Sequence, residues 1–234
     1  IKRETTFNFN NAKFFAGHSL GEYSALACSG SLTFEQTLKL LKSRGSAMQN
    51  AVPKGQGGMM AILGSKVDKI YEILDLNKNK FECFVANDNS EGQTVVSGNN
   101  KDLDFFSQEL KKEGIKNIKL PVSAPFHCKL MNHATEIMKK EIMNSNFISP
   151  NNSIISNVTA KPTQDPAEIK NLLIKQIEKP VRWRESVINM INSKVENFIE
   201  IGPGKVLSGI VKRIDRNVTI NQVNGIEDIS ILSK

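Results

Sequence analysis

The stretch Gly17-His18-Ser19-Leu20-Gly21 most constrains how this chain can fold, because it joins a predicted strand directly to a predicted helix. The apolar run 12–16 predicts a short strand and residues 22–28 predict a helix, so Ser19 stands at the corner of a strand-turn-helix. That context is typical of a nucleophile elbow, in which glycines at both ends leave room for a sharp turn. At the helix N-terminus, free backbone N–H groups and the helix dipole favour developing negative charge on a bound carbonyl oxygen. We expect Ser19 to be a nucleophile, and a plain glycine turn is the alternative.

Bulk composition narrows the class of protein. The chain has 234 residues, 39% hydrophobic and 24% charged, enough for one large domain or a domain with a smaller inserted one. No stretch approaches the roughly 20 apolar residues of a membrane span. The net charge of +7 is scattered, and no nucleic-acid-binding motif accompanies it. An acidic protein or a phosphorylated cofactor is therefore the expected partner.

The cysteines bear on the compartment. Cys28, Cys83 and Cys128 are odd in number and widely spaced, which predicts free thiols in a reducing, intracellular compartment rather than disulfides or a zinc site. No signal-peptide pattern follows Ile1. We expect the cytoplasm for a bacterial protein, and a plastid or other organelle for a eukaryotic protein whose targeting segment was removed.

A second helix follows the elbow. The capping box Thr33-Phe34-Glu35-Gln36 predicts where it begins. Its apolar face is expected to carry Leu38, Leu41 and Met48. Arg44 lies inside this helix, and the pattern alone favours a surface position for it.

The order of the later elements predicts the fold class. Between residues 59 and 120, short elements follow as strand, helix, strand, strand, helix, strand, which is typical of a ferredoxin-like module. Predicted strands near 154–156, 198–201 and 219–223 alternate with helices. The prediction is an α/β fold: a hydrolase-like core with a mostly parallel sheet flanked by helices over residues 1–58 and 121–234, and an inserted ferredoxin-like subdomain over residues 59–120.

Three histidines are candidates for the base that a serine nucleophile needs. His18 follows a tight turn beside Ser19 and is expected to pack or bond locally. His133 lies on a helix face among Asn and Ala, where a solvated side chain is expected. His127 ends a loop with two prolines directly after a predicted strand, at the sheet edge where active sites of α/β folds gather. His127 is therefore the expected base.

The sequence resembles the malonyl-CoA:acyl carrier protein transacylases of fatty acid synthesis. The resemblance rests on blocks that arrive in the family's order: Gly17-His18-Ser19-Leu20-Gly21-Glu22-Tyr23-Ser24-Ala25-Leu26, Arg44-Gly45, Ala51-Val52-Pro53, Gly92-Gln93-Thr94-Val95-Val96-Ser97-Gly98, Ala124-Pro125-Phe126-His127, Ser156-Asn157-Val158, Pro180-Val181-Arg182-Trp183 and Glu200-Ile201-Gly202-Pro203-Gly204-Lys205-Val206-Leu207. It implies an acyltransferase that forms a malonyl-serine from malonyl-CoA and passes the malonyl group, in ping-pong order, to the phosphopantetheine thiol of acyl carrier protein. We further expect no permanently bound cofactor, no metal, no nucleic acid or membrane partner, and a monomer, although the sequence does not reveal the oligomeric state.

The resemblance also implies catalytic roles. Ser19 and His127 would form a dyad, with the main-chain carbonyl of Gln176 orienting His127 in place of an acid. The N–H of Leu20 would be one oxyanion donor. Aspartates between Ser19 and His127 all belong to the predicted inserted module, where surface duty is expected.

The substrate side is implied in the same way. The guanidinium of Arg44 would meet the malonyl carboxylate with two parallel charge-assisted bonds, which lysine could not reproduce. Met59 would line the acyl pocket, although the pattern alone favours ordinary core. Phe126 resembles the malonyl-type rather than the methylmalonyl-type motif. Lys116 is a candidate for contact with the carrier or with a CoA phosphate, and a solvated lysine is the alternative.

One departure from the family concerns the second oxyanion donor. The family carries a glycine- and glutamine-rich motif near its beginning, and nothing in residues 1–10 matches it. We therefore expect an upstream segment to be missing and residues 1–234 alone to be poorly active or unstable. Two alternatives stay open: a serine esterase or thioesterase with the same elbow, and a non-catalytic module that docks a carrier. The sequence also leaves open whether fatty acid or polyketide synthesis is served.

Overall fold

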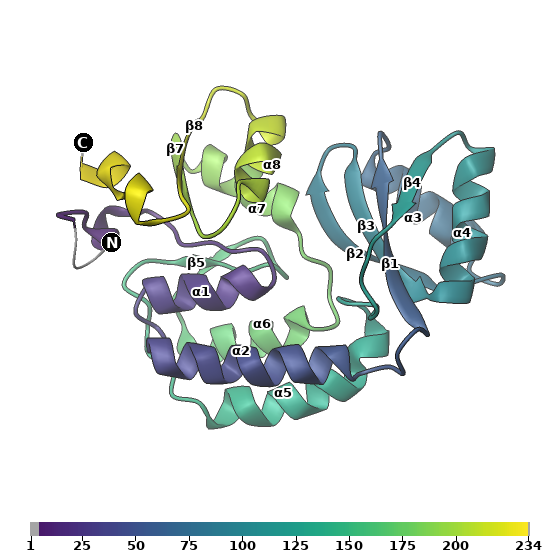
Figure 1. The fold of residues 1–234 in the computed structure, drawn as a ribbon, viewed down its shortest axis with the longest axis horizontal. Helices are drawn as coiled ribbons and strands as arrows, with labels where there is room; N and C mark the ends of the chain where they lie inside the picture. Colours follow the sequence, from purple (N-terminus) through teal and green to yellow (C-terminus); the bar gives the residue numbers. More distant parts are fainter. Residues whose placement is uncertain (1–4, 234) are drawn as a thin grey trace.

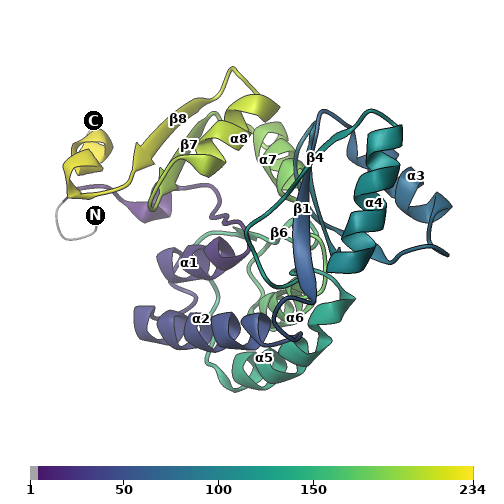
Figure 2. The ribbon, with the colours of Figure 1, turned by 45° about the vertical axis from the view of Figure 1, so that its right-hand side comes forward.

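The computed structural model describes residues 5–233, and its elements gather into three groups (Figure 1). One group is a layer of helices, the second is a four-stranded sheet with two helices, and the third holds the last two strands with two further helices. The same grouping is visible after a turn of 45° (Figure 2). A mixed α/β fold is therefore confirmed.

The helical layer consists of α1, α2, α5 and α6. Their bounds are Leu20–Cys28, Phe34–Gln49, Asn132–Asn144 and Pro166–Gln176, and the short 3-10 turn Lys129–Met131 precedes α5. A capping box begins α2, because Thr33 Oγ1 accepts from the Gln36 N–H at 3.1 Å and Gln36 Oε1 accepts from the Thr33 N–H at 3.0 Å. These helices enclose the largest apolar cluster.

The buried face of α2 differs from the one expected. Leu38 is 51% exposed, whereas Leu40, Arg44 and Met48 are buried. Residues 40, 44 and 48 are four apart and share one helix face, while position 38 lies two residues from 40 on the other side. The face that packs inward therefore carries the arginine along with the apolar side chains.

The four-stranded sheet is antiparallel, with the order β2-β3-β1-β4. Its elements run β1 (Gly57–Leu63), α3 (Val67–Leu76), β2 (Cys83–Ser90), β3 (Gln93–Asn99), α4 (Asn100–Lys112) and β4 (Lys116–Lys119). Side chains of β1 alternate, so Met60 and Ile62 pack with α3 and α4 while Met59 faces the other way, into a small cluster with Ala86 and Val95. One face of the sheet is thus covered by its own helices, and the other faces the rest of the molecule.

The remaining strands form short, separate pairings. β7 (Asn197–Ile201) and β8 (Thr219–Val223) are parallel and are connected through α8 (Val206–Ile214), and α7 (Trp183–Asn192) packs beside them. β5 (Ile154–Ile155) and β6 (Pro162–Thr163) are antiparallel. The 3-10 turns Phe9–Asn11 and Ile226–Ser233 lie near the two ends.

The single, mostly parallel core sheet that the sequence predicts is thus only partly present in residues 5–233. The expected strand at 12–16 is reduced to one parallel bridge between Phe15 and Ile154. The two ladders, of two and five residue pairs, stay separate, and Ile155 of β5 and Ile220 of β8 pack into the same apolar cluster as α7 and α8.

Candidate active site

Ser19 sits at the corner between the Phe15 segment and α1, in a strained backbone conformation. Its φ is 53° and its ψ is −102°, a region that residues with a side chain rarely occupy. A Cβ at Gly17 would lie 2.0 Å from the carbonyl carbon and oxygen of Gly21, so Gly17 must lack a side chain. A Cβ at Gly21 would meet nothing within 4 Å. The expectation that both glycines leave room is wrong for Gly21. The backbone of Gly21 approaches Gly17 closely, but a side chain at position 21 would obstruct nothing.

Ser19 and His127 lie within hydrogen-bond distance. Ser19 Oγ is 2.8 Å from His127 Nε2, and His127 Nδ1 is 2.7 Å from the main-chain oxygen of Gln176. A carbonyl only accepts, so Nδ1 carries the hydrogen and Nε2 is free to accept from the serine hydroxyl. Burial, and then the nearby charge of Arg44, lower the pKa of His127 to about 3. The imidazole is therefore neutral at ordinary pH, which is the form that a general base requires.

Arg44 points from α2 onto the same hydroxyl. Its Nη2 donates to Ser19 Oγ at 2.8 Å and to the side-chain Oε1 of Gln176 at 3.0 Å. The guanidinium carbon is 5.6 Å from the centre of the Tyr23 ring, and only 6% of the residue is exposed. Burial lowers the pKa of Arg44. Within residues 5–233 no carboxylate pairs directly with this guanidinium, and its Nε has no hydrogen-bond partner. A buried cation without an ion pair is a site suited to an anionic group.

Asn157 and the side chain of Gln176 hold this arrangement in place. Asn157 Oδ1 accepts from the Ser19 N–H at 2.7 Å, and its Nδ2 donates to the Gly17 carbonyl at 2.8 Å, so it ties both arms of the elbow. Gln176 Nε2 donates to the Ser19 carbonyl at 3.0 Å and to Glu22 Oε2 at 2.7 Å. Neither Asn157 nor Glu22 is predicted as a site residue from the sequence; their signal is their place in the Ser156-Asn157-Val158 block and in the first turn of the elbow helix.

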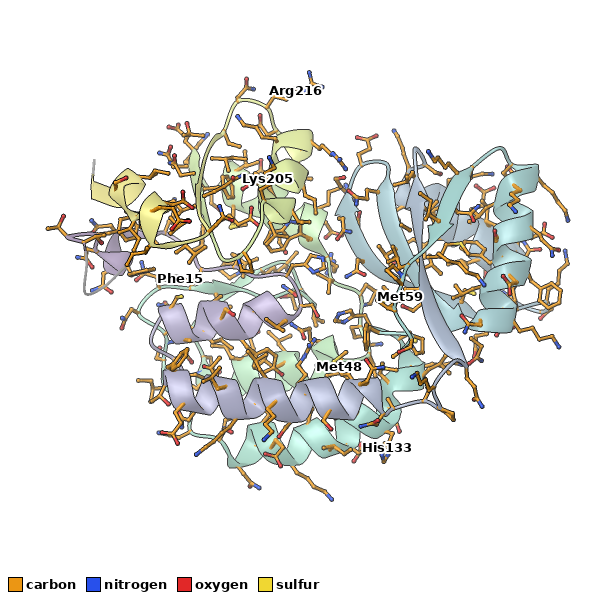
Figure 3. The ribbon with its side chains drawn as sticks, viewed as in Figure 1. Phe15, Met48, Met59, His133, Lys205 and Arg216 are labelled. Carbon is orange, nitrogen blue, oxygen red and sulfur yellow. The ribbon has the colours of Figure 1, made fainter. Side chains whose placement is uncertain are left out.

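The other predicted site residues differ in how far they are buried. Met59 is buried, and Phe126, next to His127, packs against the same small cluster. Figure 3 labels Met59 at the edge of the sheet that faces the helical layer. Lys116 begins β4 with an exposed side chain. Leu20 is the first residue of α1, which puts its N–H directly after the serine. The structure packs Met59 and Phe126 into one cluster and leaves Lys116 at the surface.

The remaining histidines are placed outside the dyad. His133 is exposed on α5 (Figure 3). His18 Nε2 is 2.8 Å from Asn89 Oδ1, and the centre of its ring is 5.7 Å from that of Trp183, so its side chain packs outside the dyad and bonds to β2. Burial lowers its pKa. A tight turn directs consecutive side chains apart, and here His18 links the elbow to the four-stranded sheet.

The sheet is also fixed to α7 by an ion pair. Arg184 Nε donates to both carboxylate oxygens of Asp88, at 3.1 and 2.9 Å, and Nη2 lies 2.8 Å from Oδ2. Backbone bonds from the Asp88 N–H to the Val181 carbonyl and from the Val181 N–H to the Ala86 carbonyl flank it. Asn89 follows directly, so this contact positions the partner of His18.

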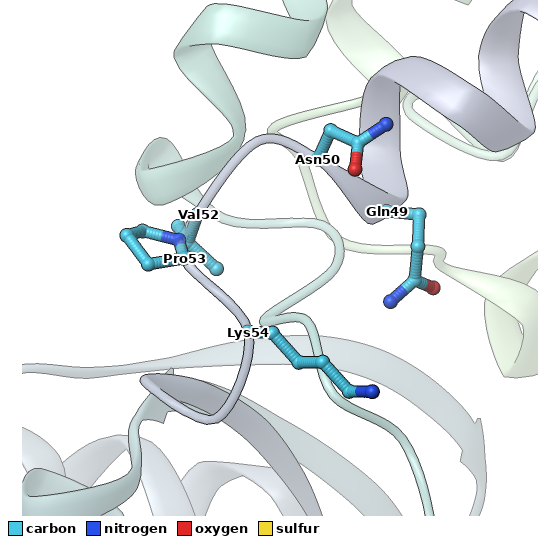
Figure 4. Close-up of a pocket in the computed structure, with 5 residues that line it drawn as sticks. All are labelled: Gln49, Asn50, Val52, Pro53 and Lys54. Atoms are coloured by element: carbon cyan, nitrogen blue, oxygen red, sulfur yellow. The ribbon is translucent and has the colours of Figure 1, made fainter.

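A surface hollow is lined by neither Ser19 nor His127. It encloses about 460 Å³ where α2 ends, and is lined by Gln49, Asn50, Val52, Pro53 and Lys54 (Figure 4). Among residues 5–233, no three His, Cys, Asp or Glu side chains are grouped to hold a metal ion. In the same residues, no helix is long and apolar enough to cross a bilayer.

A half-buried serine hydroxyl and a buried imidazole, at a sharp turn that leads into a helix, define the class of α/β proteins with a serine nucleophile elbow. Comparison with known proteins narrows this class. The family model "Acyl transferase domain" matches residues 10–233. The chain is 41% identical over 220 residues to the malonyl CoA-acyl carrier protein transacylase of Bacillus subtilis, covering 93% of this chain and 69% of that protein. It is 39% identical over 210 residues to the transacylase of the same name from Salmonella typhimurium, covering 89% and 68%.

Solved structures agree. An acyl-carrier-protein S-malonyltransferase from Bartonella henselae superposes with a TM-score of 0.93 and 37% identity, covering 98% of this chain and 75% of that one. A malonyl-transacylase in complex with its type II PKS acyl-carrier protein gives a TM-score of 0.93 and 34% identity, covering 99% and 74%. The chain therefore belongs to the acyl transferase domain family, among the malonyl CoA-acyl carrier protein transacylases.

Proposed function

We propose that this chain transfers the malonyl group of malonyl-CoA to the phosphopantetheine thiol of acyl carrier protein through a malonyl-serine. One observation carries the assignment: the Ser19 hydroxyl oxygen lies 2.8 Å from a neutral imidazole and 2.8 Å from a buried guanidinium that pairs directly with no carboxylate of residues 5–233. The imidazole activates the hydroxyl, and the guanidinium recognises a carboxylate. A malonyl thioester presents to these groups both the carbonyl and the carboxylate that they require.

The chemistry proceeds in two halves. Ser19 Oγ attacks the thioester carbonyl while its proton passes to His127 Nε2, and the Leu20 N–H donates to the oxyanion that forms. The carbon–sulfur bond then breaks, and His127 returns the proton to the sulfur of departing CoA. In the second half, the carrier thiol gives its proton to His127 and its sulfur attacks the ester carbonyl. The bond from the acyl carbon to Ser19 Oγ then breaks, and Ser19 Oγ recovers the proton from His127. The Gln176 carbonyl holds the imidazole in the one tautomer that serves both halves.

Selection of the acyl group falls to three side chains. Arg44 orients the malonyl carboxylate, so that the ester is held in a fixed pose. Met59 and Phe126, packed against one cluster beside His127, line the acyl chamber. Lys116, exposed on β4, contacts a phosphate of CoA or an acid of the carrier.

The carrier meets a basic protein, since the net charge of this chain is +7. The structural neighbour solved with an acyl-carrier protein supports a partner of the same kind. We further propose that residues 59–120 form a ferredoxin-like subdomain inserted between 1–58 and 121–234. The β2-β3-β1-β4 order, with α3 and α4 on one face, supports this division.

A radiolabel-transfer assay tests the proposed function. Malonyl-CoA radiolabelled in the malonyl group is incubated with the chain and with acyl carrier protein that bears phosphopantetheine, and the products are separated. A transacylase moves label to the carrier, and Ser19→Ala abolishes the transfer. Label appearing mainly as free malonate would indicate an esterase or thioesterase, and binding of the carrier without any transfer would indicate a docking module.

A further inference from the structure

A buried carboxylate lies behind the dyad and has no part in the steps above. Glu22 is 3% exposed, and its Oε2 accepts from Gln176 Nε2 at 2.7 Å and from the Asn157 N–H at 3.3 Å. The other end of the same amide, Gln176 Oε1, accepts from Arg44, which in turn donates to Ser19 Oγ. Carboxylate, amide and guanidinium thus form one hydrogen-bonded row that ends on the nucleophile.

The charges in this row balance when no acyl group is present. Arg44, from α2, is the charged group that acts on Glu22, one positive charge against one negative. The other titratable groups near it are neutral at ordinary pH: burial raises the pKa of Tyr23 to about 12 and lowers the pKa values of His127 and His18. α6 and the segment after β5 face Glu22 with the uncharged side chain of Gln176 and the backbone of Asn157. The buried cluster is therefore electrically neutral.

A malonyl ester on Ser19 would upset this balance. Its free carboxylate adds a second negative charge around a single guanidinium, in surroundings where Glu22, Arg44 and His127 are all almost fully buried. Uncompensated charge is so costly in such surroundings that a titratable group changes its protonation state instead. Burial already raises the pKa of Glu22 to about 7, and a new anion nearby raises it further.

We propose that Glu22 takes up one proton from solvent when a malonyl ester forms on Ser19, and releases it when the malonyl group leaves. This inference rests on the proposed function. The transfer itself is balanced, because the serine proton leaves on the CoA thiol; the proton on Glu22 is additional and offsets the charge of the substrate carboxylate. An acetyl ester brings no charge and takes up no proton at this site.

The direct test counts protons during loading. The full chain is mixed with malonyl-CoA or acetyl-CoA in weakly buffered solution near pH 7.5 with a pH indicator, and the acyl-enzyme is quantified by intact mass. We expect malonyl loading to take up most of one proton per acyl-enzyme more than acetyl loading. Ionisation of the released CoA thiol is common to both donors and cancels in the difference.

Two variants locate the proton. Glu22→Gln keeps the shape and the oxygen that accepts from Gln176, so it should load malonyl without the extra uptake. Glu200→Gln is the matched control, since Glu200 caps α8 through the N–H groups of Leu207 and Ser208 and should leave the uptake unchanged. Equal uptake with both donors, or extra uptake that survives in Glu22→Gln, would overturn the proposal.

A second measurement needs no variant, should Glu22→Gln fail to fold. The ratio of the malonyl to the acetyl loading equilibrium should fall as pH rises above about 7, with a limiting slope of about tenfold per pH unit, because proton binding is linked to malonyl binding. A ratio independent of pH from 6 to 8.5 would contradict the coupling. If Ser19 acquires no acyl group at all, the proposed function fails; if it is acylated without proton uptake, only the coupling fails.

Discussion

Replacing Arg44 by alanine should remove malonyl selection while leaving acylation of Ser19 by an uncharged donor largely intact. The side chain is 6% exposed, makes no direct ion pair with a described residue, and leaves its Nε without a hydrogen-bond partner, so a malonyl carboxylate can bind the guanidinium directly. Hydrogen bonds to charged groups contribute about 1.5–3 kcal/mol each. Two such bonds amount to roughly 3–6 kcal/mol, which at about 1.4 kcal/mol per tenfold is a loss of at least a hundredfold in kcat/KM for malonyl-CoA.

Acetyl-CoA lacks the carboxylate and should respond far less. The alanine also removes the bond from Nη2 to Ser19 Oγ, worth about 1 kcal/mol, or roughly fivefold. Initial rates with the two thioesters give both values of kcat/KM. Lys42→Ala, an exposed position on the same helix, is the matched control and should change neither. Equal losses for malonyl-CoA and acetyl-CoA in Arg44→Ala would refute the reasoning.

Other predictions concern the base, the elbow and the sheet. The rate of acylation by acetyl-CoA should persist at pH 5, because a pKa of about 3 keeps His127 neutral there. If the pKa of His127 had its usual value of 6.5, the acylation rate would fall about thirtyfold at pH 5, and a pH-rate profile distinguishes the two cases. Gly17→Ala should lower the free energy of unfolding by about 2 kcal/mol or more, at the upper end of the range of about 1–3 kcal/mol for overpacking. Gly21→Ala in α1 should be neutral or stabilising by up to about 1 kcal/mol. Equal effects of the two variants in urea denaturation would contradict the geometry. Arg184→Met should lower the free energy of unfolding by about 1–3 kcal/mol, because it leaves the Asp88 side chain, which is 8% exposed, without its ion-pair partner. A double-mutant cycle with Asp88→Asn should show coupling between the two substitutions. Additive effects would exclude the ion pair as a stabilising contact.

Local sequence was enough to predict most elements, because local signals specify them. The capping box at Thr33-Phe34-Glu35-Gln36 is present as predicted, and the order of strands and helices in residues 59–120 is that of the structure. Boundaries differ where pairing with a neighbouring strand extends an element: β2 continues to Ser90 because Ser90 pairs with Gln93 of β3, and Asn87 also bridges to Val181. The core sheet could not be predicted, since pairing between strands depends on partners distant in sequence.

In the candidate site, too, local sequence predicts some residues and contacts between distant residues decide the others. Ser19 and His127 stand out by residue type and by the turns around them. Arg44 does not, because a charged side chain on an amphipathic helix is expected at the surface. The structure shows that it shares the buried face of Leu40 and Met48, four residues away on either side. The side chain of Gln176 is bonded to Arg44 across 132 positions, a contact that no local pattern encodes.

The most direct test of the account is the chemical state of Ser19 during turnover. The chain is mixed with malonyl-CoA, quenched in acid and digested, and the peptide that contains residues 17–21 is examined by mass spectrometry. The account predicts a malonyl ester on Ser19 that disappears when acyl carrier protein with phosphopantetheine is added before the quench. A Ser19 that stays unmodified while malonyl still reaches the carrier would contradict it.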